Sequence, residues 1–130
     1  MRLVALGVAA IAALLPAART FATPGTTAPP PVVDVKITIT DSRFAVSTNR
    51  ARRGSLARFI LVNLGRKPHA FALGHERRGT GSQTGFTAAV PAGKQKINIL
   101  FLDYRGKLSY SAGLPADRAK PGMKGSFTIY

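Results

Sequence analysis

The end of the chain decides the fold, in the stretch KLSYSAGLPADRAKPGMKGSFTIY from Lys107 to Tyr130. Its first residues alternate apolar and polar side chains, as a half-buried β-strand does. A loop punctuated by Pro and Gly follows and carries one methionine, Met123. In the closing SFTIY, Phe127 and Ile129 fall on one face. The stretch therefore predicts a strand, a long loop and a final strand.

The same periodicity extends back through the chain. In VDVKITI (33–39) every second residue is Val or Ile, and HAFAL (69–73) is a further short apolar run. SLARFILVN (55–63) and KINILFL (96–102) are apolar on both faces, which predicts strands covered on both sides inside a sheet. Seven or so short strands without a convincing helix predict an all-β sandwich or barrel.

The N-terminus has the features of an export signal. Arg2 precedes the apolar run LVALGVAAIAALLPAA (3–18), and TFA (20–22) offers small residues for cleavage. We expect a signal peptide over 1–22, a Pro- and Thr-rich linker over 23–32 and one domain over 33–130. The alternative is that the run stays as an uncleaved anchor, although it is short for a membrane span. After cleavage we expect no transmembrane span and a secreted or periplasmic bacterial protein.

The absence of cysteine excludes several kinds of chemistry. A chain without cysteine has no disulfide, no thiolate nucleophile, no zinc–cysteine cluster and no sulfur ligand for a blue copper site. We also find no Ser-His-Asp pattern, no paired carboxylates and no phosphate-binding Gly loop. The sequence therefore predicts a protein that is not an enzyme.

The charge is strongly positive. Nineteen Lys and Arg residues face five acidic ones, and removal of Arg2 and Arg19 with the signal leaves a net charge of +12. Such a surface favours anionic partners, here an anionic cell-envelope component or an acidic protein. The basic residues come as scattered pairs rather than as a nucleic-acid platform, so no specific nucleic acid is expected. The expected contact surface consists of Arg52, Arg53, Arg66, Lys67, Arg77 and Arg78.

Taken together, the motifs resemble those of the cupredoxin family, which are small secreted or periplasmic Greek-key sandwiches that carry copper. The resemblance runs from Val35 to Tyr130. It rests on VKITITDSRF, GSLARFILVNLG, KPHAF, PAGK and RGKLSYSAGLPADRAKPGMKGSFTIY, in that order. It implies a Greek-key β-sandwich for this chain.

The ligand positions of the family are only partly kept. A blue copper site uses two histidines, a cysteine and usually a weak axial methionine. By the resemblance, His69 matches the first histidine and Met123 the methionine. Ala112, next to Ser111, falls at the cysteine, and Asp117 falls at the second histidine. The resemblance therefore implies a degenerate type 1 site.

Two functions remain open from the sequence. We expect an exported, non-catalytic binding module with no cofactor. The alternative is copper binding, as a carrier or electron-transfer remnant, through a weak site of His69, Asp117 and Met123 with His75 as a fourth donor. Each of these residues also has a structural explanation, as a packed histidine, a turn-capping aspartate, a core methionine or a solvated loop histidine.

Overall fold

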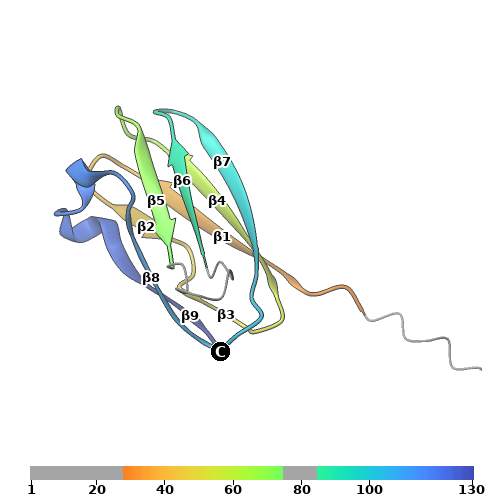
Figure 1. Cartoon of the computed structure of the whole chain (residues 1–130). Helices are drawn as coiled ribbons and strands as arrows, with labels where there is room; N and C mark the ends of the chain where they lie inside the picture. The colour runs from red at the N-terminus through yellow and green to blue at the C-terminus, as the bar shows by residue number, and fades with distance from the viewer. Residues whose placement is uncertain (1–27, 75–84) are drawn as a thin grey trace, which may run out of the picture.

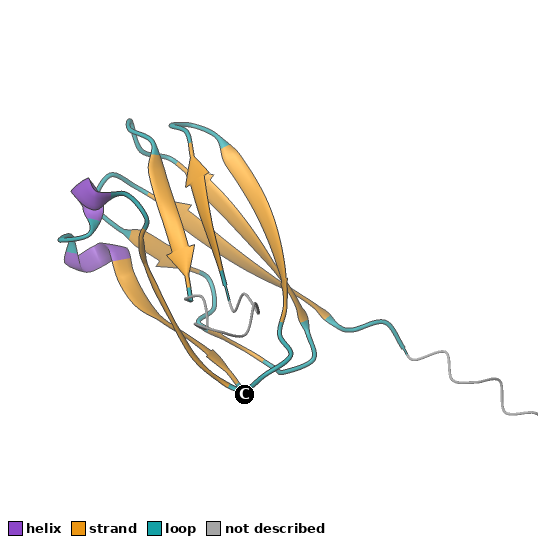
Figure 2. Ribbon diagram, in the orientation of Figure 1, coloured by secondary structure: helices purple, strands orange, loops and turns teal. Residues whose placement is uncertain are grey.

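The computed structural model describes residues 28–74 and 85–130, and within them the chain forms nine strands and two short 3-10 helices (Figures 1 and 2). The elements are β1 (Val32–Ile39), β2 (Phe44–Val46), β3 (Arg50–Ala51), β4 (Leu56–Asn63), β5 (His69–Leu73), β6 (Phe86–Val90), β7 (Gln95–Phe101), β8 (Gly106–Ala112), η1 (Pro115–Asp117), η2 (Pro121–Met123) and β9 (Lys124–Ile129). The proposed signal segment, His75, Arg77 and Arg78 lie outside the described residues. No helix in the described part of the chain has the length and apolar character needed to cross a membrane.

The strands form two mixed sheets, in the orders β2-β1-β4-β7 and β3-β9-β8-β5-β6. The pairs β1–β4 and β3–β9 are parallel, and the other pairs are antiparallel. Figure 1 shows the sheets face to face, with η1 and η2 at one end and the C-terminus at the other. This architecture confirms the predicted cupredoxin-like β-sandwich.

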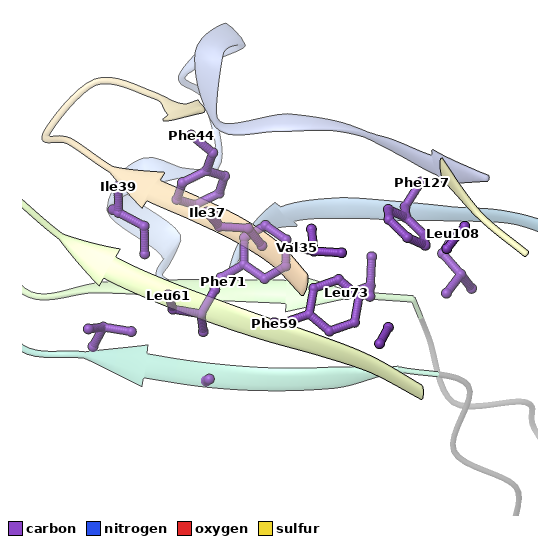
Figure 3. Close-up of a cluster of buried hydrophobic side chains, with 14 of the residues drawn as sticks. Val35, Ile37, Ile39, Phe44, Phe59, Leu61, Phe71, Leu73, Leu108 and Phe127 are labelled. Carbon is purple, nitrogen blue, oxygen red and sulfur yellow. The ribbon is translucent and has the colours of Figure 1, made fainter. Parts of the chain in front are cut away.

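Alternation along the strands builds the core between the sheets. In β1, Val35, Ile37 and Ile39 are buried while Asp34 and Lys36 are exposed, as the sequence predicts. The strand begins at Val32, directly after Pro31, because proline cannot donate to the ladder. Apolar side chains from both sheets fill the interior (Figure 3).

Aromatic rings connect the two sheets across this core. Phe59 of β4 meets Phe127 of β9 with ring centroids 5.6 Å apart, and Phe44 of β2 meets Phe71 of β5 at 5.2 Å. Both pairs are edge-to-face, the geometry that the ring quadrupoles favour. Each pair joins one sheet to the other, so the aromatic rings help to pack the two sheets together.

The prediction that β7 is covered on both faces is wrong. β7 is an edge strand of its sheet, and Ile97, Ile99 and Phe101 are 49%, 66% and 50% exposed. β4 does lie inside the sheet, as expected, but its Ile60 is only partly buried, because no second sheet of the described residues covers that face. In this protein, a strand with apolar residues on both faces is therefore not necessarily buried on both faces.

Candidate functional site

The segment between β4 and β5 delivers His69 to one end of the sandwich. It starts from Asn63, which is fully buried at the end of β4. The Asn63 amide nitrogen donates to the carbonyls of Lys67 and Val90, both at 2.9 Å, and its oxygen accepts from Gly65 N at 2.8 Å. One satisfied buried amide thus closes the turn and fixes the start of β5.

The imidazole of His69 lies between two carboxylates. Its Nδ1 is 2.6 Å from Oδ2 of Asp117, and its Nε2 is 2.8 Å from Oδ1 of Asp41. The His69 side chain is only 2% exposed. A carboxylate can only accept, so both contacts are hydrogen bonds only when both ring nitrogens carry a proton. The geometry is therefore that of an imidazolium held by two anions.

Asp41 reaches this position through strand pairing. The parallel β1–β4 register places Ile39 beside Asn63, so the turn after β1 lies against the turn after β4. The Asp41 carboxylate accepts from Arg66 N at 3.1 Å as well as from His69. These hydrogen bonds, that from His69 first, lower the pKa of Asp41 from 3.8 to about 2.

Gly65 makes the approach of Asp41 possible. A Cβ built at Gly65 would overlap with Oδ1 of Asp41 and would crowd the side-chain oxygen of Asn63. Only glycine leaves room for the carboxylate at this turn. Asn63 and Gly65 therefore both shape the site. The amide of Asn63 closes the turn, and the absence of a side chain at Gly65 leaves room for the Asp41 carboxylate.

Asp117 enters from the loop before β9, at the end of η1. Its Oδ1 accepts from Lys120 Nζ at 2.7 Å, and the same ammonium group donates to the backbone oxygen of Asp41 at 2.7 Å. Burial raises the pKa of Asp117, but the hydrogen bonds from Lys120 and His69, together with their charges, outweigh burial and leave this pKa below its usual value. Two cations and two carboxylates therefore form one charge-balanced network, the histidine network.

Met123 ends η2 and is 1% exposed. It belongs to the hydrophobic core cluster, as does Ala112 at the end of β8. The structure thus brings His69 and Asp117 together and buries Met123 among apolar side chains. Sequence reasoning missed Asp41 and Lys120, and the signal for Asp41 was available only through the pairing of β1 with β4.

The residues present do not fit a type 1 copper centre. Ala112 occupies the position that matches the family's cysteine, and its methyl side chain has no lone pair to bind a metal. Both nitrogens of His69 are engaged by carboxylates, so a metal would have to displace a proton and an ion pair. Within residues 28–74 and 85–130, no three side chains of the His, Cys, Asp and Glu types are arranged to hold a metal ion.

The predicted basic surface is divided in the structure. Arg52 and Arg53 precede β4, whereas Arg66 and Lys67 follow it, and all four are exposed. The eight residues of β4 separate the two pairs by roughly 26 Å, at about 3.3 Å per residue. One pair therefore lies at the histidine network and the other at the opposite end of the sandwich.

Comparison with solved structures identifies the fold. A dithionite-reduced auracyanin from Roseiflexus castenholzii matches with a TM-score of 0.57 and 14% identity, over 75% of this chain and 96% of that chain. Rusticyanin from Thiobacillus ferrooxidans matches with a TM-score of 0.57 and 16% identity, over 76% and 77%. A copper-binding protein in its apo form matches with a TM-score of 0.55 and 12% identity, over 76% and 88%.

No protein-family model and no curated protein sequence matches the chain. At these identities the likeness concerns the backbone and not the ligands. The chain therefore has the cupredoxin-like fold, built without any cysteine and with His69 paired to two carboxylates where the resemblance places the first copper ligand.

Proposed function

We propose that the chain is an exported, non-catalytic binding module in which the histidine network takes the structural place of a metal centre. The observation that supports this most is the engagement of both His69 nitrogens by Asp117 and Asp41. A side chain with both nitrogens protonated has no lone pair to offer a metal. The network connects three loops by hydrogen bonds, as a metal would, without any redox chemistry.

The partners in this proposal are anionic, either a cell-envelope component or an acidic protein. Three of the four described acidic residues are already engaged: Asp34 pairs with Arg58, and Asp41 and Asp117 pair with His69. Most of the positive charge is therefore uncompensated inside the domain. Exposed charge of one sign attracts oppositely charged partners and loses this attraction as salt screens it.

Two measurements test the proposal. On a sulfated polysaccharide matrix, the processed protein should be retained at low ionic strength and released steeply as salt increases. Titration with Cu(II) and Cu(I), followed by calorimetry and visible absorption, should show neither stoichiometric binding nor an intense visible band. Salt-independent behaviour on the matrix removes the binding proposal, and a coloured one-to-one copper complex contradicts the metal-free role.

Copper binding is the second candidate, because the structure brings His69 and Asp117 together at one end of the sandwich. Their Nδ1 and Oδ2 atoms would be nitrogen and oxygen donors suited to Cu(II) once the 2.6 Å hydrogen bond between them is broken. Met123 would add a thioether for Cu(I). This alternative predicts one copper per chain, lost in His69→Ala and kept in Asp34→Asn, an aspartate outside the network. Copper that binds equally to both variants would belong to another site.

A further inference from the structure

The end of the sandwich opposite the histidine network carries an arginine-lined cavity. Arg52, Arg53 and Gly54, from the turn between β3 and β4, form one wall, and Arg105, from the turn between β7 and β8, forms another. Tyr130, directly after β9, completes the lining, and the cavity has a volume of about 580 Å³. The cavity is open to solvent on one side, so a bound molecule would stay partly exposed.

The backbone beneath the cavity is fixed by hydrogen bonds. Gly54 N donates to Leu102 O at 2.6 Å, and Leu102 N donates back to Ser55 O at 2.9 Å, so the two turns are joined. Gly54 has a φ of +87°, a conformation that glycine adopts without strain. Main-chain hydrogen bonds therefore hold the arginine-bearing turns beside each other.

Two of the surrounding side chains are positioned by the protein itself. Arg53 Nε donates to Asp103 O at 3.0 Å, and Arg53 N donates to Tyr130 O at 2.7 Å. The guanidinium group of Arg50 stacks over the Tyr130 ring at 4.3 Å from its centroid. Arg52 and Arg105 differ, because their guanidinium groups make no hydrogen bond or ion pair with other described residues.

Charge and donor geometry indicate the ligand class. Among the residues that the structure describes, no acidic side chain lines this cavity, and the three cations that do are arginines. A guanidinium group presents a planar fork of N–H donors that matches the oxygens of a phosphate group in a bidentate way. The volume exceeds that of a phosphate ion alone, and the tyrosine ring adds an amphipathic wall.

We propose that the cavity between Arg52, Arg53 and Arg105 binds a phosphate group, either free or as the ester of a small polyol. The proposal deepens the proposed function, since it gives the basic surface one specific anion site. It predicts saturable binding of one anion per chain, competed by sulfate. Inorganic phosphate and glycerol 3-phosphate distinguish the two sources: equal affinity indicates the free ion, and tighter binding of the ester indicates a phosphorylated polyol.

The test compares two double variants of equal charge. Arg52→Gln with Arg105→Gln removes the two guanidinium groups that have no partner in the described structure, so the fold should be unaffected. Lys94→Gln with Lys96→Gln removes the same charge from β7 and the turn before it, outside the lining residues. In titrations of the full processed chain, the arginine variant should bind phosphate at least about tenfold more weakly, because charge-assisted hydrogen bonds are lost. The lysine variant should change the affinity by less than about threefold. Lys94 and Lys96 lie outside the lining, so they act on the bound anion only through screened charge.

Equal weakening in both variants, or no saturable binding of either phosphate ligand, overturns the site. Retention of the same proteins on the sulfated matrix separates this outcome from failure of the proposed function. Salt-dependent retention without saturable phosphate binding contradicts the cavity site alone. Saturable phosphate binding without retention on the matrix contradicts the proposed function and leaves the site supported.

Discussion

Replacing Asp117 by asparagine keeps the size of the side chain and removes its charge. Asp117 accepts two short hydrogen bonds from cations, 2.6 Å from His69 and 2.7 Å from Lys120. An asparagine has one acceptor oxygen and one amide group that only donates, so one of the two cations loses its acceptor. The His69 and Asp117 side chains are 2% and 6% exposed, so water cannot replace the lost partner at low cost.

The structure sets the size of this effect. A hydrogen bond to a charged group contributes about 1.5–3 kcal/mol, and breaking a buried ion pair by removing one partner costs about 3–5 kcal/mol. Lys120 is partly exposed and can recover hydration, which favours the lower end. We expect the free energy of unfolding to fall by about 3 kcal/mol at neutral pH. In a domain of this size that corresponds to a decrease in Tm of roughly 12 °C or more.

Urea unfolding at neutral pH, extrapolated linearly to water, measures the change. Asp34→Asn is the matched control, because it removes the same charge from an exposed ion pair with Arg58, and exposed pairs contribute little to stability. An unchanged m-value is required, so that the comparison concerns stability and not the denatured state. If Asp117→Asn destabilises no more than Asp34→Asn, the histidine network does not hold the loops together and the reasoning is refuted.

Three further predictions concern the same end of the sandwich. The pKa of Asp41 is lowered from 3.8 to about 2, and the pKa of Asp117 is also lowered. The stabilising effect of these two carboxylates is therefore complete above pH about 4 and is lost as the pH falls toward 2. Acid titration followed by intrinsic fluorescence should show this loss of stability, and Asp117→Asn should make the loss smaller. Gly65→Ala should destabilise the domain and weaken the contact between Asp41 and His69, since the added methyl group occupies the place of the carboxylate; an unchanged His69 ring signal in NMR spectra would argue against this packing. Met123→Ala should cost about 2–5 kcal/mol in urea unfolding and Met123→Leu less than about 1.5 kcal/mol, as for a buried core side chain, whereas equal losses would indicate a role for the sulfur.

Much of the fold follows from periodicity, but the position of each strand in its sheet does not. Alternation in residues 33–39 gives the buried face of β1 correctly, because the side-chain period of two is a local property. The sequence around Ile97 and Ile99 is as apolar as that around Phe59, yet β7 is an edge strand and β4 an inner one. That difference depends on which strands lie beside each, and local patterns do not contain it.

The candidate site, too, is only partly predictable from the sequence. By the resemblance, Asp117 falls at the family's second histidine, and the structure brings its side chain to His69. No local pattern of the sequence marks Asp41 as a partner of His69. Its contact with His69 spans 28 positions and arises from the parallel pairing of β1 with β4. A carboxylate placed by long-range register cannot be found from the spacing of neighbouring residues.

The charge balance of the histidine network also decides how the two candidate functions relate to each other. The imidazolium of His69 and the ammonium of Lys120 offset the carboxylates of Asp41 and Asp117. A metal ion could bind His69 only after a ring proton leaves, and it would then repel the ammonium group 2.7 Å from Asp117. Metal binding at this end therefore requires dismantling the contacts that join the loops, so stabilisation by the network and tight copper binding exclude each other in one molecule. The arginine-lined cavity is free of this conflict, because the length of β4 separates it from the network.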